Sequence, residues 1–291
     1  MNTALKSGKK TTTIYPATLV SSKRLFPEDK ETREEVRELV IEVGDSSFTC
    51  EAGQSIGILA PTPKGAIDQW HLRWYSVADI PAGNDKGNPR FTIFVRRMVL
   101  KDPETGLICR GHASNYLCDL APGESIKITG PQGIPFEVPP EKDATLILIG
   151  TGTGIAPFRA FIKHIYRNVP DWKGIVRLFY GTRNGLDILY TNDPNEDVIQ
   201  YFDRETFEAF KALSPPPNWA DPIAWDMAYS ERGSELLEKL DDPKTYVYLA
   251  GLEPIRDHLD NMFGALMGSK EKWKQKKESL IDQKRWIEVL Y

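Results

Sequence analysis

The sequence contains few of the residues that build metal centres and disulfide frameworks. Its 291 residues include only three cysteines and four histidines. Three thiols are too few for a disulfide framework or for the four thiolates that hold an iron–sulfur cluster. The histidines include no pair at helical spacing, which argues against a protein-bound zinc site. We therefore expect any redox chemistry to use an organic cofactor, with no bound metal, in a reducing compartment such as the cytoplasm.

Long apolar runs are also absent. No stretch approaches the roughly 18 uninterrupted apolar residues of a membrane helix, and the start, MNTALKSGKKTTTIY, has no apolar signal region. The net charge of −4 argues against nucleic acid as the main partner. With 41% hydrophobic and 27% charged residues, the chain has the composition of a globular protein of about two domains without a membrane span.

The first half of the sequence consists of short β-rich runs separated by turn signals such as Ala52-Gly53. This spacing is typical of an antiparallel barrel. The prolines of segment 135–140 then predict a linker, because consecutive prolines cannot continue a central strand. The predicted strands are 37–43, 55–59, 73–77, 91–95 and 125–129.

From residue 139 the pattern changes to apolar strands that alternate with helices, the first helix opening at Pro157. Fully apolar strands between helices are typical of a parallel sheet covered on both faces. The predicted fold is therefore an antiparallel β-barrel domain over 1–138 and an α/β parallel-sheet domain over 139–291. The predicted strands of the second domain are 145–149, 175–180, 245–250 and 286–291.

A glycine-rich loop, GTGTGIAPFRAF from Gly150 to Phe161, follows the first of these apolar strands. The glycines allow a tight turn and a close approach to a ligand, and the free N–H groups of the following helix would face an anion. The loop matches neither G-x-G-x-x-G, because Ile155 takes the last glycine's place, nor a P-loop. It fits a phosphate or a nicotinamide, and a plain strand-to-helix turn is the alternative.

The same stretch resembles the pyridine-nucleotide motif of the plant-type ferredoxin–NADP reductase family. Further motifs follow the family's order: EAGQSIGI at 51–58, RWYS at 73–76, GHASNYLCD at 111–119 and a terminal aromatic, Tyr291. The similarity extends over nearly the whole chain from Ile14. It implies that the barrel binds FAD and that the second domain binds NADP(H).

The resemblance assigns the RWYS motif to the flavin. Arg73 would pair with the FAD pyrophosphate, for which a guanidinium offers matching donors. Tyr75 would stack on the isoalloxazine ring, and Ser76 would bond near the nitrogen that accepts the hydride. The two-residue period of a strand places Arg73 and Tyr75 on one face, and Trp74 and Ser76 on the other.

Two more segments are assigned to FAD by the resemblance. Phe94 and Val95 would line the site, Arg96 would add a cation near the phosphates, and Leu100 replaces the tyrosine that many members place against adenine. The backbone of the GHAS segment would bind the pyrophosphate, with a hydroxyl from its serine. Without the resemblance, Arg96 and Arg97 would be an exposed strand-edge pair and Ser114 a helix cap. The GHAS residues assigned to FAD are His112, Ala113 and Ser114.

The nucleotide site would combine the glycine loop with later positions. NADP-specific members read Ser-Arg-Glu where this chain reads Ser230-Glu-Arg-Gly233. Glu231 would repel a 2′-phosphate and could bond a ribose diol, so NADH stays open beside NADPH. The residues assigned to the nucleotide are Thr153, Gly154, Arg183, Ser230, Arg232, Gly251 and Leu252.

The implied activity is that of an FAD-dependent oxidoreductase between NADP(H) and an acidic electron carrier, ferredoxin or flavodoxin. Ser76, Tyr291 and Glu288 are the expected catalytic residues. The chain departs from the family at two positions: Ala250 replaces the usual cysteine, and Glu288 lies one residue before the position where the family has its carboxylate. The alternatives are an NADH-dependent reductase component of an oxygenase and a flavin module without hydride exchange. A docking patch or a solvated helix face is expected from Lys270, Lys272, Lys274, Lys276 and Lys277.

Overall fold

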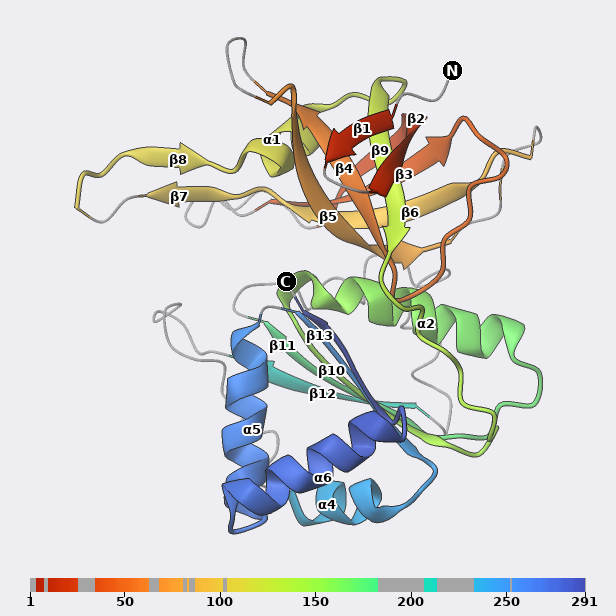
Figure 1. Cartoon of the computed structure of the whole chain (residues 1–291), viewed down its shortest axis with the longest axis vertical. Helices are drawn as coiled ribbons and strands as arrows, with labels where there is room; N and C mark the ends of the chain where they lie inside the picture. Colours follow the sequence, from red (N-terminus) through yellow and green to blue (C-terminus); the bar gives the residue numbers. More distant parts are fainter. Residues whose placement is uncertain are drawn as a thin grey trace. The chain divides into compact units, whose positions relative to one another are not determined.

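The computed structural model describes residues 4–7, 10–25, 35–62, 68–80, 83, 87–101, 104–182, 207–213, 233–251 and 253–290. The chain divides into two compact units, Met1–Pro135 and Phe136–Tyr291 (Figure 1). The division lies a few residues before the boundary expected from the sequence. Phe136 belongs to the second unit because its ring stacks on Phe158, with centroids 5.8 Å apart, and meets Tyr248 at 5.1 Å.

The first unit is an antiparallel barrel, which confirms the predicted architecture. Its strands follow the order β2-β3-β6-β5-β4-β9, and a pairing of β2 with β9 closes the sheet. The short strand β1 (Ala4–Ser7) pairs antiparallel with the first residues of β2. The barrel strands are β2 (Lys10–Arg24), β3 (Val36–Val43), β4 (Ser55–Pro61), β5 (Trp70–Asp79), β6 (Arg90–Arg96) and β9 (Ser125–Gln132).

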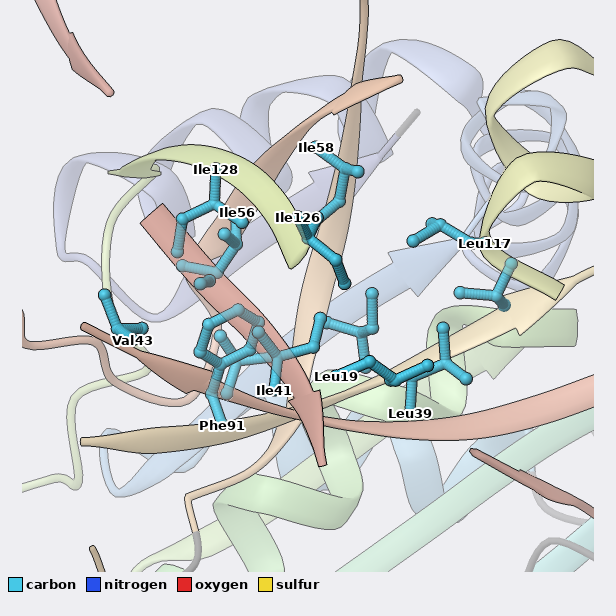
Figure 2. Packing of buried hydrophobic residues seen from close by; sticks show 14 of the residues in the cluster. Leu19, Leu39, Ile41, Val43, Ile56, Ile58, Phe91, Leu117, Ile126 and Ile128 are labelled. Atoms are coloured by element: carbon cyan, nitrogen blue, oxygen red, sulfur yellow. The ribbon is translucent and has the colours of Figure 1, made fainter. Parts of the chain in front are cut away.

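The barrel interior is filled by alternate residues of its strands and by one helix. Figure 2 shows Leu39, Ile41, Ile56 and Ile126 pointing inward, together with Leu117 from α1 (His112–Asp119). All but Ile126, which is 2% exposed, are fully buried. Each such side chain contributes about 1.5–3 kcal/mol when it leaves water. This packing fixes α1 against the barrel, which matters for the site below.

The second unit contains a five-stranded sheet in the order β12-β11-β10-β13-β14, and every neighbouring pair is parallel. The prediction of a parallel sheet is thus confirmed, but β12 was not predicted. Its sequence FEAFKAL has the composition of a helix, and its pairing with β11 overrides that propensity. The strands are β10 (Thr145–Thr151), β11 (Val176–Thr182), β12 (Phe207–Leu213), β13 (Thr245–Gly251) and β14 (Trp286–Leu290).

Helices cover both faces of this sheet. Figure 1 shows α2 (Ile155–Asn168) on one face and α4 (Gly233–Asp241), α5 (Pro254–Leu266) and α6 (Lys270–Asp282) on the other. Helix α2 begins at Ile155 and not at the predicted Pro157, because the 3₁₀ turn Gly152–Gly154 leads directly into it. Pro157 lies within the first turn, where a helix does not need its N–H group.

Two general properties accompany this fold. Within the described ranges, no helix is both long and apolar enough to cross a membrane. Cys50, Cys109 and Cys118 are all free thiols.

Candidate functional site

The entry into α1 is a tightly fixed turn. It follows the hairpin of β7 (Val99–Lys101) and β8 (Ile108–Arg110). The Gly111 N–H donates to the Met98 carbonyl at 2.9 Å, and a β-carbon on Gly111 would lie 2.8 Å from the Met98 β-carbon. The Ser114 hydroxyl accepts from the Met98 N–H at 3.1 Å and donates to the Gly111 carbonyl at 3.2 Å. Ser114 therefore lies inside the helix and braces the turn, whereas Gly111 occupies the cap position.

The N-terminus of α1 is open to an anion. No side chain caps it, and its first turn contains no acidic residue. The N–H groups of His112, Ala113 and Ser114 have no carbonyl partner within the helix, and the helix dipole makes this end positive. The end of α1 can thus bind a phosphate through backbone donors.

Strand β5 carries the RWYS motif next to α1, which packs against β4, β5 and β6. Arg73 and Tyr75 pair with Ile58 and Ile56 of β4, whereas Trp74 and Ser76 pair with Gly57 and Ser55. The predicted alternation is therefore the observed one. The Arg73 side chain is exposed, and no group in the described part of the chain forms a hydrogen bond or an ion pair with it.

Tyr75 differs from Arg73 in being half-buried against the barrel core. Burial raises the pKa of its hydroxyl well above 10, and the neighbouring Cys118 adds to this shift. Burial also raises the pKa of the Cys118 thiol to about 12. The Tyr75 side chain is therefore neutral, and it packs against the apolar core of the barrel.

The barrel opens between β5 and β6. These strands pair only at Val77 with Ile93 and Asp79 with Thr92, with a register shift between the two pairs. The edge of β5 that precedes Val77 is left without a β6 partner, so its backbone groups can face a ligand. On β6, Phe94 and Val95 are buried, so only their backbone is available, whereas the Arg96 side chain is exposed.

A partly buried ion network, which the sequence did not reveal, holds α1 in place. Arg97 bonds to Glu35 at 2.6 Å, to Asp119 at 2.8 Å and to Asn115 at 3.2 Å. Burial would raise the pKa of Glu35, but the hydrogen bonds and charges of Arg97 and Arg37 lower it below 4.5. Arg97 is thus a structural residue and not an exposed strand-edge cation. Its partners are far apart in the sequence, and no local signal identifies them.

The strand order of the second unit indicates a candidate ligand site at the carboxyl ends of β10 and β13. Strand β10 lies between β11 on one side and β13 on the other, so the order of the strands reverses at β10. Open α/β sheets bind ligands at the carboxyl ends of the strands at such a reversal. A β-carbon on Gly150 would lie 2.9 Å from the Phe158 ring, and Gly251 has a φ of 141°. The glycine loop and the uncapped start of α2 meet at this edge, with Thr153 half-buried between them.

The carboxylate of Glu288 is bonded to other side chains of the second unit. It accepts from Arg256 at 2.7 Å, from Trp286 at 2.7 Å and from Lys277 at 3.1 Å. Burial would raise the pKa of Glu288, but these hydrogen bonds and the Lys277 charge lower it below 4.5. The catalytic role expected for Glu288 finds no support in this geometry.

The lysines of α6 divide into two groups. Lys270 bonds to Asn261 at 2.8 Å, Lys276 pairs with Asp241, and Lys277 pairs with Asp260 and Glu288. These four contacts support the packing of α6. The side chains of Lys272 and Lys274 are exposed and form neither an ion pair nor a hydrogen bond with another described residue, whereas the exposed Lys270 is held by the neutral amide of Asn261.

The remaining expected site residues lie outside the described residues. They are Arg183, Ser230, Arg232, Leu252 and Tyr291.

Comparison with known proteins identifies relatives along most of the chain. Residues 148–260 match the family model of the oxidoreductase NAD-binding domain. The ferredoxin–NADP reductase of Spirulina sp. is 32% identical over 259 residues, which cover 86% of this chain and 87% of that protein. The chloroplastic leaf isozyme 2 of Oryza sativa subsp. japonica is 33% identical, with 85% and 68% covered.

The chain is shorter than some of these relatives. The alignment with the ferredoxin–NADP reductase of Picosynechococcus sp., at 31% identity, covers 88% of this chain but 65% of that protein. Among solved structures, the ferredoxin–NADP⁺ reductase of Plasmodium falciparum shares the fold, with a TM-score of 0.68, 20% identity and complete coverage of both chains. By sequence similarity over nearly its whole length, together with the two-domain fold, this chain belongs to the ferredoxin–NADP reductase family.

Proposed function

We propose that this protein is an FAD-dependent oxidoreductase that transfers electrons between NADP(H) and ferredoxin or flavodoxin. The proposal rests on an arrangement in the barrel. Arg73 is exposed and has no bonded partner among the described residues. Its strand, β5, packs against α1, whose N-terminus no side chain caps. A guanidinium and several free N–H groups form a donor set that suits a pyrophosphate.

The residues around this donor set fit FAD. Tyr75 supplies a neutral ring for a flavin, and the open edge of β5 lies next to it in the barrel. Bound FAD would accept a hydride as an electron pair and release the electrons one at a time. The chain's own contribution is to bind and orient the cofactor, with Ser76 as a hydroxyl donor on the opposite face of β5 from Tyr75.

NADP(H) would bind at the carboxyl ends of β10 and β13. The glycine loop brings the start of α2 to this edge, so its N–H groups can hold an anionic part of the nucleotide. The names of the relatives support NADP(H) over NADH. The three free thiols support a reducing compartment, and we propose the cytoplasm.

The partner would dock in part through Lys272 and Lys274 on α6, whose charges are not neutralised by ion pairs in the described structure. An acidic carrier would be attracted by this field at low ionic strength. Lys276 and Lys277 are less suited to docking because carboxylates within the unit pair with their charges, and Lys270 is held by a hydrogen bond to Asn261.

The test is stopped-flow mixing of the FAD-loaded protein with NADPH and, separately, with NADH. We expect NADPH to bleach the flavin rapidly and NADH to do so more slowly. Rapid bleaching by NADH alone would indicate a reductase of another electron chain. A flavin that neither nucleotide reduces would show that the chain is a binding module and would overturn the proposal.

A further inference from the structure

Two exposed histidines meet at the N-terminus of α1. His71, on β5, and His112, the first residue of α1, lie edge to face with ring centroids 5.6 Å apart. The proposed function uses only the backbone of His112, and it gives His71 no role. Two imidazoles beside an open helix N-terminus nevertheless place two ionisable donors where an anion is expected.

The tautomer of His112 is determined by its hydrogen bond. Its Nε2 lies 2.7 Å from the Pro61 carbonyl oxygen, which can only accept, so Nε2 carries the proton. In the neutral ring, Nδ1 then presents a lone pair, which repels a phosphate oxygen. When the ring gains a second proton, Nδ1 becomes a charged donor. His112 can therefore bind a phosphate through its side chain only as an imidazolium.

The period of β5 aligns His71 with the cation that the proposed function already uses. His71 and Arg73 are two residues apart, so they lie on the same face of the strand, about 6.6 Å apart along it. The contact of His71 with His112 brings this face to the start of α1. A pyrophosphate, which has two charged groups, can span such a row of donors.

The other charged groups near α1 determine how protonation responds to an anion. Strand β4 has no titratable side chain, β5 adds Arg73 and, at its far end, Asp79, and β6 adds the exposed Arg96 and Arg90, which is paired with Glu42. The exposed Arg110 of β8 directly precedes the turn into α1. The carboxylates of Glu35 and Asp119 are bonded to Arg97, and Asp68 is an exposed acid shortly before β5. The surroundings are therefore mainly cationic. An anion bound beside the two rings favours their protonated forms, so anion binding and proton binding favour each other.

We propose that His71 and His112 bind the FAD pyrophosphate as imidazolium ions, so that FAD is held more tightly as the pH falls. The inference rests on the proposed FAD site and concerns the side chains of His71 and His112, to which that site gives no role. The sign follows from linkage: the FAD-bound state favours the protonated rings, so the affinity for FAD rises as the pH falls through the range in which histidines titrate, between about pH 8 and 5.

The experiment measures the dissociation constant of FAD by the quenching of its fluorescence at about pH 6 and pH 8. The proteins are the parent, His71→Gln, His112→Gln and the double variant. Glutamine can still donate to the Pro61 carbonyl, and the far-UV circular dichroism of each variant checks folding. His164→Gln, an exposed histidine on α2, is the matched control.

We expect the parent and His164→Gln to bind FAD about tenfold more tightly at the lower pH, a factor within the range of one charge-assisted hydrogen bond. The double variant should lose this pH dependence and resemble the parent at the higher pH. Binding of FAD that is equally tight at both pH values in the parent would overturn the inference while leaving the FAD site intact. Failure of the parent to bind FAD at either pH would instead overturn the proposed function.

Discussion

The backbone oxygen of Ala250 lies so close to Gly154 that a β-carbon on Gly154 would come within 2.3 Å of it. The contact joins the start of α2 to the carboxyl end of β13, at the edge where the nucleotide is proposed to bind. No residue other than glycine fits without moving one of these elements. The third glycine of the loop thus allows the start of α2 and the end of β13 to approach each other at this edge.

Gly154→Ala should destabilise the protein by about 1–3 kcal/mol and weaken NADPH binding, because the backbone of α2 or β13 must shift. Urea unfolding and a nucleotide titration measure the two effects. Gly44→Ala is the control, since its β-carbon would have no contact closer than 3.3 Å. Equal stability of Gly154→Ala and the parent would show that the loop can accommodate a β-carbon without a loss of stability.

Arg73→Ala should weaken FAD binding by about 1.5–3 kcal/mol, the contribution of a hydrogen bond to a charged group. Dialysis followed by the ratio of flavin to protein absorbance gives the retained fraction. Arg167→Ala removes an exposed arginine from α2 and should retain FAD like the parent. If Arg73→Ala also retains FAD like the parent, the assignment of Arg73 to the pyrophosphate is incorrect.

Replacing Lys272 and Lys274 together by glutamate should slow the reduction of ferredoxin at low salt and leave ferricyanide reduction unchanged. The reason is that a local field steers an acidic protein but acts little on the turnover of a small acceptor in excess. The difference should shrink as salt is added. A proportional loss with both acceptors would assign these lysines to the folding of α6.

Glu288→Gln should reduce the free energy of unfolding at neutral pH by about 1–3 kcal/mol, between the values for exposed and buried ion pairs. Because the pKa of Glu288 is lowered from 4.5 in the folded state, its contribution is fully present above about pH 4.5 and disappears as the pH falls through the lower, folded-state value. Thermal unfolding between neutral and acidic pH should show the parent approaching the variant in acid. A constant difference at every pH would contradict this role.

Tyr291→Ser tests the terminal aromatic, which lies outside the described residues. If the ring stacks on the flavin and competes with the nicotinamide, its removal should tighten the binding of both nucleotides and favour the poorer one proportionally more. Equilibrium titrations with NADP⁺ and NAD⁺ measure both affinities. Unchanged affinities with a lower melting temperature would indicate that Tyr291 only fills a gap in the core.

Local sequence was sufficient to predict the two architectures and much of the candidate site. The two-residue period of β5 determined which face carries Arg73 and which carries Ser76, because side chains alternate along any strand. The glycine loop predicted a tight turn from strand to helix, and the contact of Gly154 with Ala250 explains why glycine is needed there. These features depend on neighbouring residues, so a linear pattern can encode them.

Only the tertiary structure decided which charged groups are free and which are used in packing. The partners of Arg97 and Glu288 come from strands and helices that are distant in the sequence, so no spacing identifies them. The same holds for α6, where equal lysines have different environments because only some of them reach a carboxylate. Strand β12 likewise exists because β11 offers it hydrogen bonds, against the helical composition of its own residues. The charge of a residue and its secondary-structure propensity follow from its type, whereas its ion-pair and hydrogen-bond partners are determined by the fold.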